Sequence, residues 1–478
     1  MSRSTTSRSR RRSTAEAGQS VEIKTFPQAV RYLYDRADYE RSRIVRYNEE
    51  TFKLDRIRAL LKELGNPHEK VRFVHVAGSV GKGSTAAMIA SMLRGCGYAV
   101  GQFSSPHLVD VRERIAINDS PIGKSDFTEL MRIVAEAAGK LKQEPTFFEM
   151  ITAAGFYHFA DEAVDIAVIE VGLGGRLDST NVITPEVSVI TQIDYDHTHI
   201  LGMTLKEIAR EKAGIFKKGV PALSVEQPEE VEQVLREAAE EAGTALHIIN
   251  KDIEFSYRFG ASEDLGPHIR VCLITEASQF MHLPVPLPGE HQGQNCGVAL
   301  ATIDTLKSSG FEFNELDVHD GLANAKIPGR MELVWKRPRI LVDGAHNPTS
   351  VGALMRCVGV YQPYDSMVCI FGCCEDKDIP QMMDKLALGG DKVIFTRAKG
   401  NARAADPEEL QRVFNERSGK MSQLARNLPE ALDLASRAVG RDDLICVTGS
   451  FYLVGEAKKH LAELEKKHAQ TNRQSSRR

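Results

Sequence analysis

The segment GSVGKGST, at residues 78–85, carries residue types that suit phosphate binding, between an apolar run and a run with helical spacing. Glycines let backbone N–H groups converge on an anion without interference from a Cβ atom, and the N-terminus of the following helix adds partial positive charge. Lys82 supplies a full positive charge, while Ser84 or Thr85 could cap the helix or approach Mg²⁺. The spacing is G-x-x-G-K-G-[ST] rather than the usual G-x-x-x-x-G-K-[ST]. We predict a nucleotide-phosphate site; the alternative is a tight turn with a solvent-exposed lysine.

Charged residues follow the apolar run DIAVIEVG, at residues 165–172. A continuous apolar run is typical of a strand buried on both faces of a parallel sheet, and such sheets bind ligands at the carboxyl ends of their strands. Glu170 at that end is a candidate Mg²⁺ ligand, with capping of the adjacent loop as the alternative. Arg176 and Asp178, in the loop that follows, could clamp an anionic group.

A second polar cluster follows the run VSVITQI, at residues 187–193, and consists of Asp194, Asp196, His197 and His199. Any one histidine is more often a surface or hydrogen-bonded residue than a ligand. A cluster at the same sheet edge as the two groups above favours a functional site.

The next segment, LKEIAREKAGIFKKG at residues 205–219, has the spacing of an amphipathic helix. On spacing alone, Lys212 is expected to pair with Glu207 or Glu211 on the helix surface. Upstream, TFFEM at residues 146–150 is expected to start another helix.

In that helix start, Thr146 and Glu149 are spaced as a capping box. Phe147 and Phe148 between them could line a flat apolar pocket.

The second half of the chain contains the turn DGAHNP after an apolar run, with Asp343, His346 and Asn347. Such a turn can face a cleft between domains, and the alternative is an Asx-type turn before Pro348. Arg330, in the Pro-Gly segment AKIPGRME, could reach a phosphate when the two halves close.

The elements that must position these residues form two α/β halves. Apolar strand-like runs alternate with helical segments such as 84–95, 147–161 and 204–216, which predicts two open parallel sheets with flanking helices. The segment 325–332 is the expected hinge. The strand-like runs are 71–78, 98–105, 165–172 and 187–193 in the first half, and 339–348, 367–372, 392–398 and 444–450 in the second.

Composition excludes several classes of protein. The 478 residues carry 61 Lys and Arg against 65 Asp and Glu, a formal charge of −4, so sequence-independent nucleic-acid binding is not expected. The sequence contains no run of 18 apolar residues, so no membrane-spanning helix is predicted. The 8 cysteines form no C-x-x-C pair, which favours reduced thiols in a cytoplasm. The Ser- and Arg-rich residues 1–20 and the polar residues 466–478 are expected to be disordered tails.

Taken together, these motifs resemble the folylpolyglutamate synthase and dihydrofolate synthase family, ATP-dependent amide ligases of the Mur ligase superfamily. The resemblance implies an N-terminal P-loop ATPase-like domain over 21–325 and a smaller C-terminal Rossmann-like α/β domain over 326–465. The matching segments follow the family order and are HVAGSVGKGST (75–85), FSSPHL (103–108), ERIAIN (113–118), TFFE (146–149), EVGLGGRLDSTN (170–181), DHTHILG (196–202), EKAGIF (211–216), GEHQGQN (289–295), IPGRME (327–332), VDGAHNP (342–348), EDKD (375–378) and TGSFYL (448–453).

The resemblance also implies roles for single residues, with Lys82, His197 and Lys212 as catalytic and Lys212 carbamylated. The implied Mg²⁺ ligands are Ser105, Glu170 and His197. The implied ATP contacts are Gly78, Ser79, Val80, Gly81, Lys82, Gly83, Ser84, Asn295, Arg330, Asp343 and His346. The implied folate contacts are Thr146, Phe147, Phe148, Glu149, Arg176 and Asp178. The chain departs from the family pattern at Ser79-Val80 (usually Thr-Asn), Ser179 (usually Ala) and Cys296 (commonly Ala).

The expected reaction is the ATP- and Mg²⁺-dependent addition of L-glutamate to dihydropteroate, to the terminal glutamate of folates, or to both, through an acyl phosphate. The expected enzyme is a cytoplasmic monomer that binds neither nucleic acid nor membrane. One alternative is another Mur-type ligase that acts on a different carboxylate. The other is a nucleotide-dependent binding protein without ligase activity.

Overall fold

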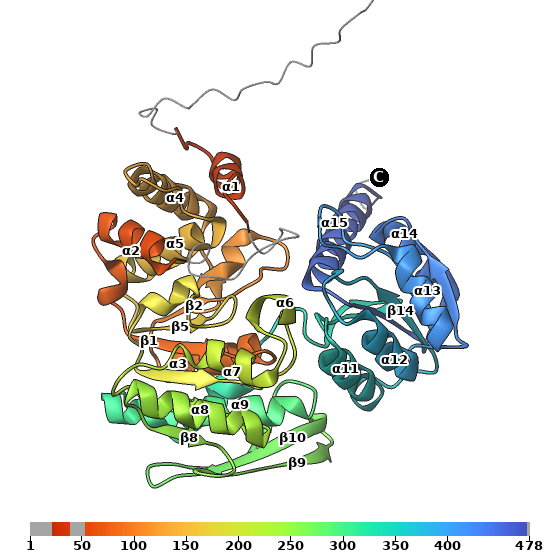
Figure 1. The fold of residues 1–478 in the computed structure, drawn as a ribbon. Coiled ribbons are helices and arrows are strands. Elements are labelled where there is room, and N and C mark those ends of the chain that lie inside the picture. Colours follow the sequence, from red (N-terminus) through yellow and green to blue (C-terminus); the bar gives the residue numbers. More distant parts are fainter. Residues whose placement is uncertain (1–21, 39–52, 476–478) are drawn as a thin grey trace, which may run out of the picture.

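An eight-stranded sheet in the order β4-β3-β2-β5-β1-β6-β7-β8 forms the centre of the first lobe in a computed structural model that describes residues 22–38 and 53–475 (Figure 1). The pairs from β2 to β8 are parallel, and β3 and β4 add an antiparallel edge. Every residue of β1 and β5 is buried, because helices cover both faces. The strands are β1 (Phe73–Ala77), β2 (Val100–Phe103), β3 (Ile115–Ile117), β4 (Ser120–Pro121), β5 (Ile166–Glu170), β6 (Val187–Ile190), β7 (Ala222–Ser224) and β8 (Leu246–Ile248). The predicted parallel sheet is therefore confirmed.

Two helical layers enclose this sheet. One core packs β1 and β5 against α3 (Lys82–Gly95), α9 (His291–Leu306) and α10 (Glu315–Ala323). The opposite core contains α1 (Phe26–Tyr34), α2 (Leu54–Glu63), α4 (Lys124–Ala138) and α5 (Phe147–Asp161). A further core holds α7 (Leu205–Ala213) and α8 (Glu229–Ala242) beside β6 to β8, with the short α6 (Thr198–Leu201) next to them.

An antiparallel three-stranded sheet, absent from the sequence prediction, also belongs to this lobe. Its strands are β9 (Glu254–Ser262), β10 (Gly266–Ile274) and β11 (Gln279–Val285). Phe255, Ile269 and Val271 from one face pack into the core beside α9, while much of the other face is exposed. Such half-buried strands lack the continuous apolar run that marks the central strands.

The second lobe is a six-stranded sheet in the order β12-β13-β17-β14-β15-β16. Only β12 pairs antiparallel, and the other pairs are parallel. Helices α11 (Pro348–Tyr361), α12 (Ile379–Gly389) and α13 (Pro407–Arg417) cover one face, and α14 (Leu428–Ala438) and α15 (Phe451–Ser475) cover the other. The strands are β12 (Glu332–Lys336), β13 (Arg339–Val342), β14 (Met367–Phe371), β15 (Lys392–Phe395), β16 (Met421–Leu424) and β17 (Leu444–Thr448).

The connection and the ends of the chain bear on the expected boundaries. α10 ends at Ala323 and β12 begins at Glu332, so the segment 325–332 joins the two lobes. The expected tail at 1–20 lies outside the described residues. The tail expected from 466 is wrong as far as 475, because α15 continues to Ser475; residues 466–475 contain no Gly or Pro to end the helix. Within the described residues, no helix combines the length and the apolar character that crossing a bilayer requires.

Candidate active site

A cavity of about 640 Å³ lies between the two lobes, and both contribute to its wall. The first lobe provides the glycine-rich loop, Ser105, Phe148 and Glu170, at the carboxyl ends of its strands. The second lobe provides residues that follow β13, β14 and β17. The carboxyl ends of the strands in the two sheets thus face each other, and parallel sheets bind ligands at these ends.

The glycine-rich loop between β1 and α3 needs glycine for steric reasons. Gly78 has φ +150°, and a Cβ atom there would lie 1.9 Å from Thr191 Oγ1. Gly81 is left-handed, with φ +92°, and a Cβ atom would lie 2.3 Å from Asn295 Oδ1. Ser79, Val80, Gly81, Lys82 and Gly83 all line the cavity.

The first turn of α3 faces this cavity without a side-chain cap, because its N-cap is Gly81. Neither Ser84 nor Thr85 therefore caps this helix, which was one of the two roles expected for them. Ser84 is buried beside Gln292, whose amide donates to its hydroxyl at 3.4 Å. Lys82 Nζ donates to the Gly78 carbonyl oxygen at 3.2 Å. An uncapped helix N-terminus with a lysine at its first residue can bind an anion.

Glu170 and His197 have the properties of cation ligands. Glu170 Oε2 accepts a hydrogen bond from the Ser105 backbone N–H at 3.3 Å. Burial raises the pKa of Glu170, although the charge of Lys82 opposes the shift. His197, left-handed at φ 49°, is the N-cap residue of α6, and its buried Nδ1 has no hydrogen-bond partner among the described residues. Burial lowers the pKa of His197 to about 3, so its imidazole is neutral and keeps a lone pair.

Lys212 does not lie on the helix surface, so the predicted pairing with Glu207 or Glu211 is wrong. Its side chain is buried, and Nζ donates to the Gly78 carbonyl oxygen at 2.8 Å. Burial, assisted by the charge of Lys82, lowers the pKa of Lys212 to about 7. Glu207 instead completes a capping box with Thr204, and Glu211 pairs with Arg176. Tertiary packing has overridden the helix spacing here.

Arg176 and Asp178 do not form the expected anion clamp. Arg176 is absent from the cavity wall, and its guanidinium bonds to Glu211 at 3.0 Å. Asp178 does line the cavity, but its carboxylate accepts from the Leu173 N–H at 2.8 Å and from the Thr180 N–H at 3.0 Å and hydroxyl at 2.5 Å. Asp178 therefore closes its own loop.

The TFFE segment begins α5 with the predicted capping box, since Thr146 and Glu149 bond to each other's backbone N–H. Only one of the two phenylalanines reaches the cavity. Phe148 lines it and packs against Gly172, where a Cβ atom would lie 2.4 Å from the ring. Phe147 is buried in the core, where its ring stacks on that of Tyr34 with the ring centres 5.2 Å apart. The two phenylalanines differ because neighbouring residues of a helix point in different directions.

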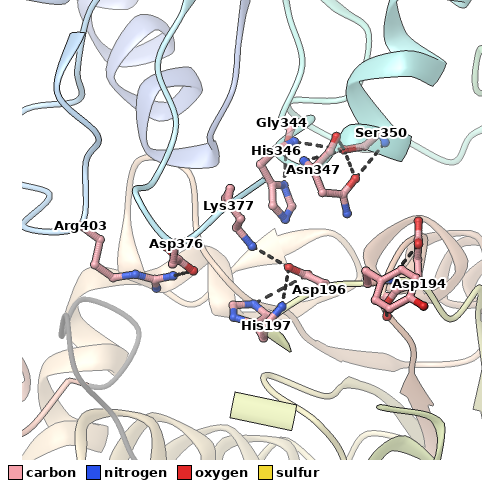
Figure 2. Close-up of polar contacts among 12 residues, drawn as sticks. Asp194, Asp196, His197, Gly344, His346, Asn347, Ser350, Asp376, Lys377 and Arg403 are labelled. Carbon is pink, nitrogen blue, oxygen red and sulfur yellow. Dashed lines mark hydrogen bonds and ion pairs between the residues drawn. The ribbon is translucent and has the colours of Figure 1, made fainter. Parts of the chain in front are cut away.

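In the second lobe, the turn after β13 is built as the sequence indicated. Asn347 caps α11 through the Ser350 N–H at 2.8 Å, and His346 Nδ1 lies 2.7 Å from the Gly344 carbonyl oxygen (Figure 2). His346 lines the cavity. Arg330 also lines it, with its guanidinium 4.6 Å from the centre of the Phe451 ring.

Asn295 and Asp343 lie behind the cavity wall rather than in it. Asp343 is buried, and its two oxygens accept from the N–H groups of Met331 and Ala345 at 2.9 and 2.8 Å. Asn295 supports Gly81 from α9. Asp343 thus holds the backbone on either side of residues that line the cavity, and Asn295 packs against the glycine-rich loop.

An ion pair between the lobes escaped the sequence analysis. Lys377 Nζ lies 2.6 Å from Asp196 Oδ1, and both side chains are only 8% exposed (Figure 2). Beside it, Arg403 bonds to Asp376 at 2.6 Å. Lys377 stands in the EDKD motif, but 181 positions separate it from Asp196, so spacing alone could not pair them.

We expect Lys377→Met to destabilise the protein by about 3 kcal/mol, because it leaves the Asp196 carboxylate buried without its partner. Urea unfolding followed by circular dichroism measures the loss, and Lys399→Met, at an exposed lysine of the same lobe, is the control. The double variant Asp196→Asn with Lys377→Met should regain most of the lost stability. Equal stability of Lys377→Met and wild type would contradict the buried pair.

Comparison with known proteins places this architecture in a family. Residues 76–303 match the Mur ligase middle domain, and residues 329–451 match the Mur ligase glutamate ligase domain. A dihydrofolate synthase/folylpolyglutamate synthase of Bacillus subtilis is 33% identical over 420 residues, which cover 85% of this chain and 94% of the relative. A probable bifunctional folylpolyglutamate synthase/dihydropteroate synthase of Haloferax volcanii is 34% identical over 441 residues, or 91% of this chain. The match covers 50% of that relative, so the chain spans about half its length.

Solved structures agree with the sequence matches. The folylpolyglutamate synthase of Mycobacterium tuberculosis complexed with ADP superposes with a TM-score of 0.82 at 31% identity, covering 91% of this chain and 97% of the other. FolC of E. coli in complex with DHPP and ADP gives a TM-score of 0.79 at 29% identity, and the match covers 92% of this chain and 99% of the other. The chain therefore belongs to the folylpolyglutamate synthase and dihydrofolate synthase family of Mur ligases.

Proposed function

We propose that this chain is an ATP-dependent ligase that adds L-glutamate to dihydropteroate, to the terminal glutamate of folates, or to both, through an acyl phosphate. The observation that carries the proposal is one cavity in which a phosphate-binding loop, an aromatic wall and the charged face of a second lobe meet. The relatives named as dihydrofolate or folylpolyglutamate synthases support the substrate class.

ATP is assigned to the loop side of the cavity. The uncapped N-terminus of α3 and Lys82 receive the phosphates, and Arg330 and His346 approach from the second lobe. Asn295 and Asp343 act indirectly, because Asn295 packs directly against Gly81 and Asp343 holds the backbone that presents His346. The ADP bound in the similar M. tuberculosis and E. coli structures supports a nucleotide in this family's fold.

Glu170, His197 and the hydroxyl of Ser105 fit a Mg²⁺ ion. The buried carboxylate and the neutral imidazole with a partnerless Nδ1 are both available as ligands. Among the described residues, no three His, Cys, Asp or Glu side chains form a closed metal cage, and Mg²⁺ typically uses few protein ligands beside water and substrate phosphates. Bound there, the ion would supply Lewis-acid stabilisation of charge on the phosphates.

The residues of the cavity can bring two anions together. The acid substrate and the triphosphate repel each other, and Lys82 and Arg330 supply positive charge between them. A carboxylate oxygen of the acid attacks the γ-phosphorus, and ADP leaves. The amine of L-glutamate then attacks the acyl carbon, so that an amide forms and inorganic phosphate departs. The Lys377–Asp196 pair holds the lobes together around this reactive anhydride, and exclusion of water protects it from hydrolysis.

The two organic substrates are assigned to different walls. Phe148 offers a flat face to a pteridine ring, beside Thr146 and Glu149. L-glutamate, with two carboxylates, is assigned to the second lobe, where Lys377 and Arg403 line the cavity.

Mass spectrometry of the products tests the proposal. The protein is incubated with ATP and L-glutamate, and with either dihydropteroate, tetrahydrofolate or a peptidoglycan precursor. We expect products that gain one or more glutamyl residues from dihydropteroate, tetrahydrofolate or both, with one ADP released for each amide formed. ADP release independent of glutamate would instead indicate a nucleotide-dependent binding protein. Ligation confined to the peptidoglycan precursor would indicate a different Mur-type ligase.

A further inference from the structure

A buried histidine outside the cavity is connected to the cavity wall by two successive hydrogen bonds. His75 lies in the middle of β1 and has no exposed surface. Its Nε2 lies 2.8 Å from Thr180 Oγ1, and the Thr180 hydroxyl donates to Asp178 Oδ1 at 2.5 Å. Asp178 is the N-cap of the short 3₁₀ helix Ser179–Val182.

The hydrogen-bond inventory determines the direction of this chain. A hydroxyl has one hydrogen, and Thr180 gives it to Asp178. His75 Nε2 must therefore donate to Thr180 Oγ1, which leaves the other ring nitrogen, Nδ1, without a hydrogen. That Nδ1 is buried with no partner among the described residues, and an unpaired buried acceptor is less costly than an unpaired buried N–H. Burial also lowers the pKa of His75 to about 3, so the ring is neutral.

The carboxylate at the end of this chain shapes the loop 172–180. Asp178 Oδ2 accepts the Leu173 N–H at 2.8 Å, while Oδ1 accepts the Thr180 N–H at 3.0 Å. These bonds tie the two ends of the loop together, and Gly172, Leu173, Leu177, Asp178 and Ser179 all line the cavity. Gly172 packs against the Phe148 ring so closely that no Cβ atom would fit. The loop conformation thus determines the space beside Phe148.

We propose that His75 is a positioning residue, whose Nε2–H orients the Thr180 hydroxyl toward Asp178 and so holds the loop 172–180 as the wall of the pteridine pocket. The inference rests on the proposed function, which assigns the pteridine to Phe148, the ring against which this loop packs. His75 precedes the glycine-rich loop by three positions in the sequence, but its side chain bonds to Thr180 instead. Gly78 is held independently by Lys82 and Lys212, which both donate to its carbonyl oxygen, and packs closely against Thr191.

Three substitutions separate this role from simple packing. His75→Gln retains an N–H near the position of Nε2, His75→Asn places its amide near Nδ1, and His75→Leu removes both. Dissociation constants for dihydropteroate, tetrahydrofolate and ADP are measured with each full-length variant by intrinsic fluorescence or calorimetry. We expect His75→Asn and His75→Leu to weaken binding of the pteridine about tenfold, with ADP binding within about twofold of wild type. His75→Gln should stay much nearer to wild type for both ligands.

A second pair of variants gives the same test should the histidine variants fail to fold. Thr180→Val removes the hydroxyl and should weaken pteridine binding as His75→Asn does, whereas Thr180→Ser should preserve it. In a double variant, Thr180→Val should add little to His75→Asn, because both break one chain. ¹⁵N NMR of labelled histidine should show the Nε2–H tautomer for His75.

Several results would overturn the assignment. They are equal behaviour of His75→Asn and His75→Gln, an equal loss of pteridine and ADP affinity, or an Nδ1–H tautomer. Failure of this inference is distinct from failure of the proposed function. Wild type that binds a pteridine while all the variants bind it equally well overturns only the role of His75. Wild type that binds no pteridine overturns the proposed function and this inference together.

Discussion

Lys82→Met should lower the release of ADP in the complete reaction by about 1,000-fold or more, while the protein remains folded. Lys82 is the first residue of α3, and its Nζ reaches over the glycine-rich loop to the Gly78 carbonyl oxygen. The positive charge at this point stabilises the phosphates most strongly when negative charge moves from the γ-phosphate toward the leaving ADP. The variant should therefore lose more turnover than ATP affinity, because the lysine stabilises the transition state beyond the bound substrate.

The stability of this variant should change little, since the side chain makes one hydrogen bond worth about 1 kcal/mol. Lys124→Met is the matched control, because Lys124 is also the first residue of a helix, α4, but is exposed. Turnover by product analysis, affinity by calorimetry and melting by circular dichroism give the three readouts. Near-normal turnover in Lys82→Met would remove the lysine from the chemistry.

The parts of the fold that could be predicted depend on strong local signals. The runs around β1, β5, β6, β14 and β17 are apolar at nearly every position, because both faces of these strands are buried. The capping box at Thr146 and Glu149 is likewise a local pattern, and it occurs as predicted. Positions at the carboxyl ends of such strands could then be assigned to one edge without knowing any distance.

The rest of the site depends on contacts between distant segments. Lys212 has helix neighbours of opposite charge, so the sequence spacing predicted that its side chain lies on the helix surface. Instead, the side chain reaches Gly78 across the lobe. Phe147 and Phe148 are adjacent and of one type, and only the packing of α5 decides which reaches the cavity. The Lys377–Asp196 pair joins two lobes. In each case the deciding contact is tertiary, so no local pattern could reveal it.

Lys212→Ala should lower glutamate-dependent turnover by about 100-fold, with partial rescue by added acetate or propionate. We propose that Lys212 acts as a carbamate, as the resemblance to the family implies. An ammonium beside a divalent cation is repelled, whereas a carbamate carries negative charge and can help to hold the ion. A carbamate nitrogen keeps one N–H, so the bond to the Gly78 carbonyl oxygen can persist.

Carbamate formation needs the neutral amine, which attacks CO₂ as a proton leaves the nitrogen. With the pKa of Lys212 lowered to about 7, roughly half of the side chains are neutral at pH 7, against fewer than about one in a thousand for an ordinary lysine. The neutral fraction falls as the pH falls below 7. Turnover in air-equilibrated buffer, where CO₂ is limiting, should therefore decline more steeply on acidification than turnover with saturating bicarbonate.

Lys206→Ala, at an exposed lysine of the same helix, controls for the loss of a lysine from α7 and should keep normal turnover. A ¹³C NMR signal of a carbamate after equilibration with ¹³CO₂, absent from Lys212→Ala, gives a readout independent of activity. Full activity of Lys212→Ala, or no carbamate signal in the active wild type, would exclude this role.

The two lysines should also affect each other. The charge of Lys82 is one cause of the lowered pKa of Lys212, after burial. Lys82→Met should therefore raise that pKa and reduce the neutral fraction of Lys212 at pH 7. It follows that the carbamate signal should weaken in Lys82→Met, and that bicarbonate should restore it. The double variant Lys82→Met with Lys212→Ala should then lose less turnover than the two single losses combined predict. The reason is that Lys82→Met already removes part of the carbamate that Lys212→Ala removes completely.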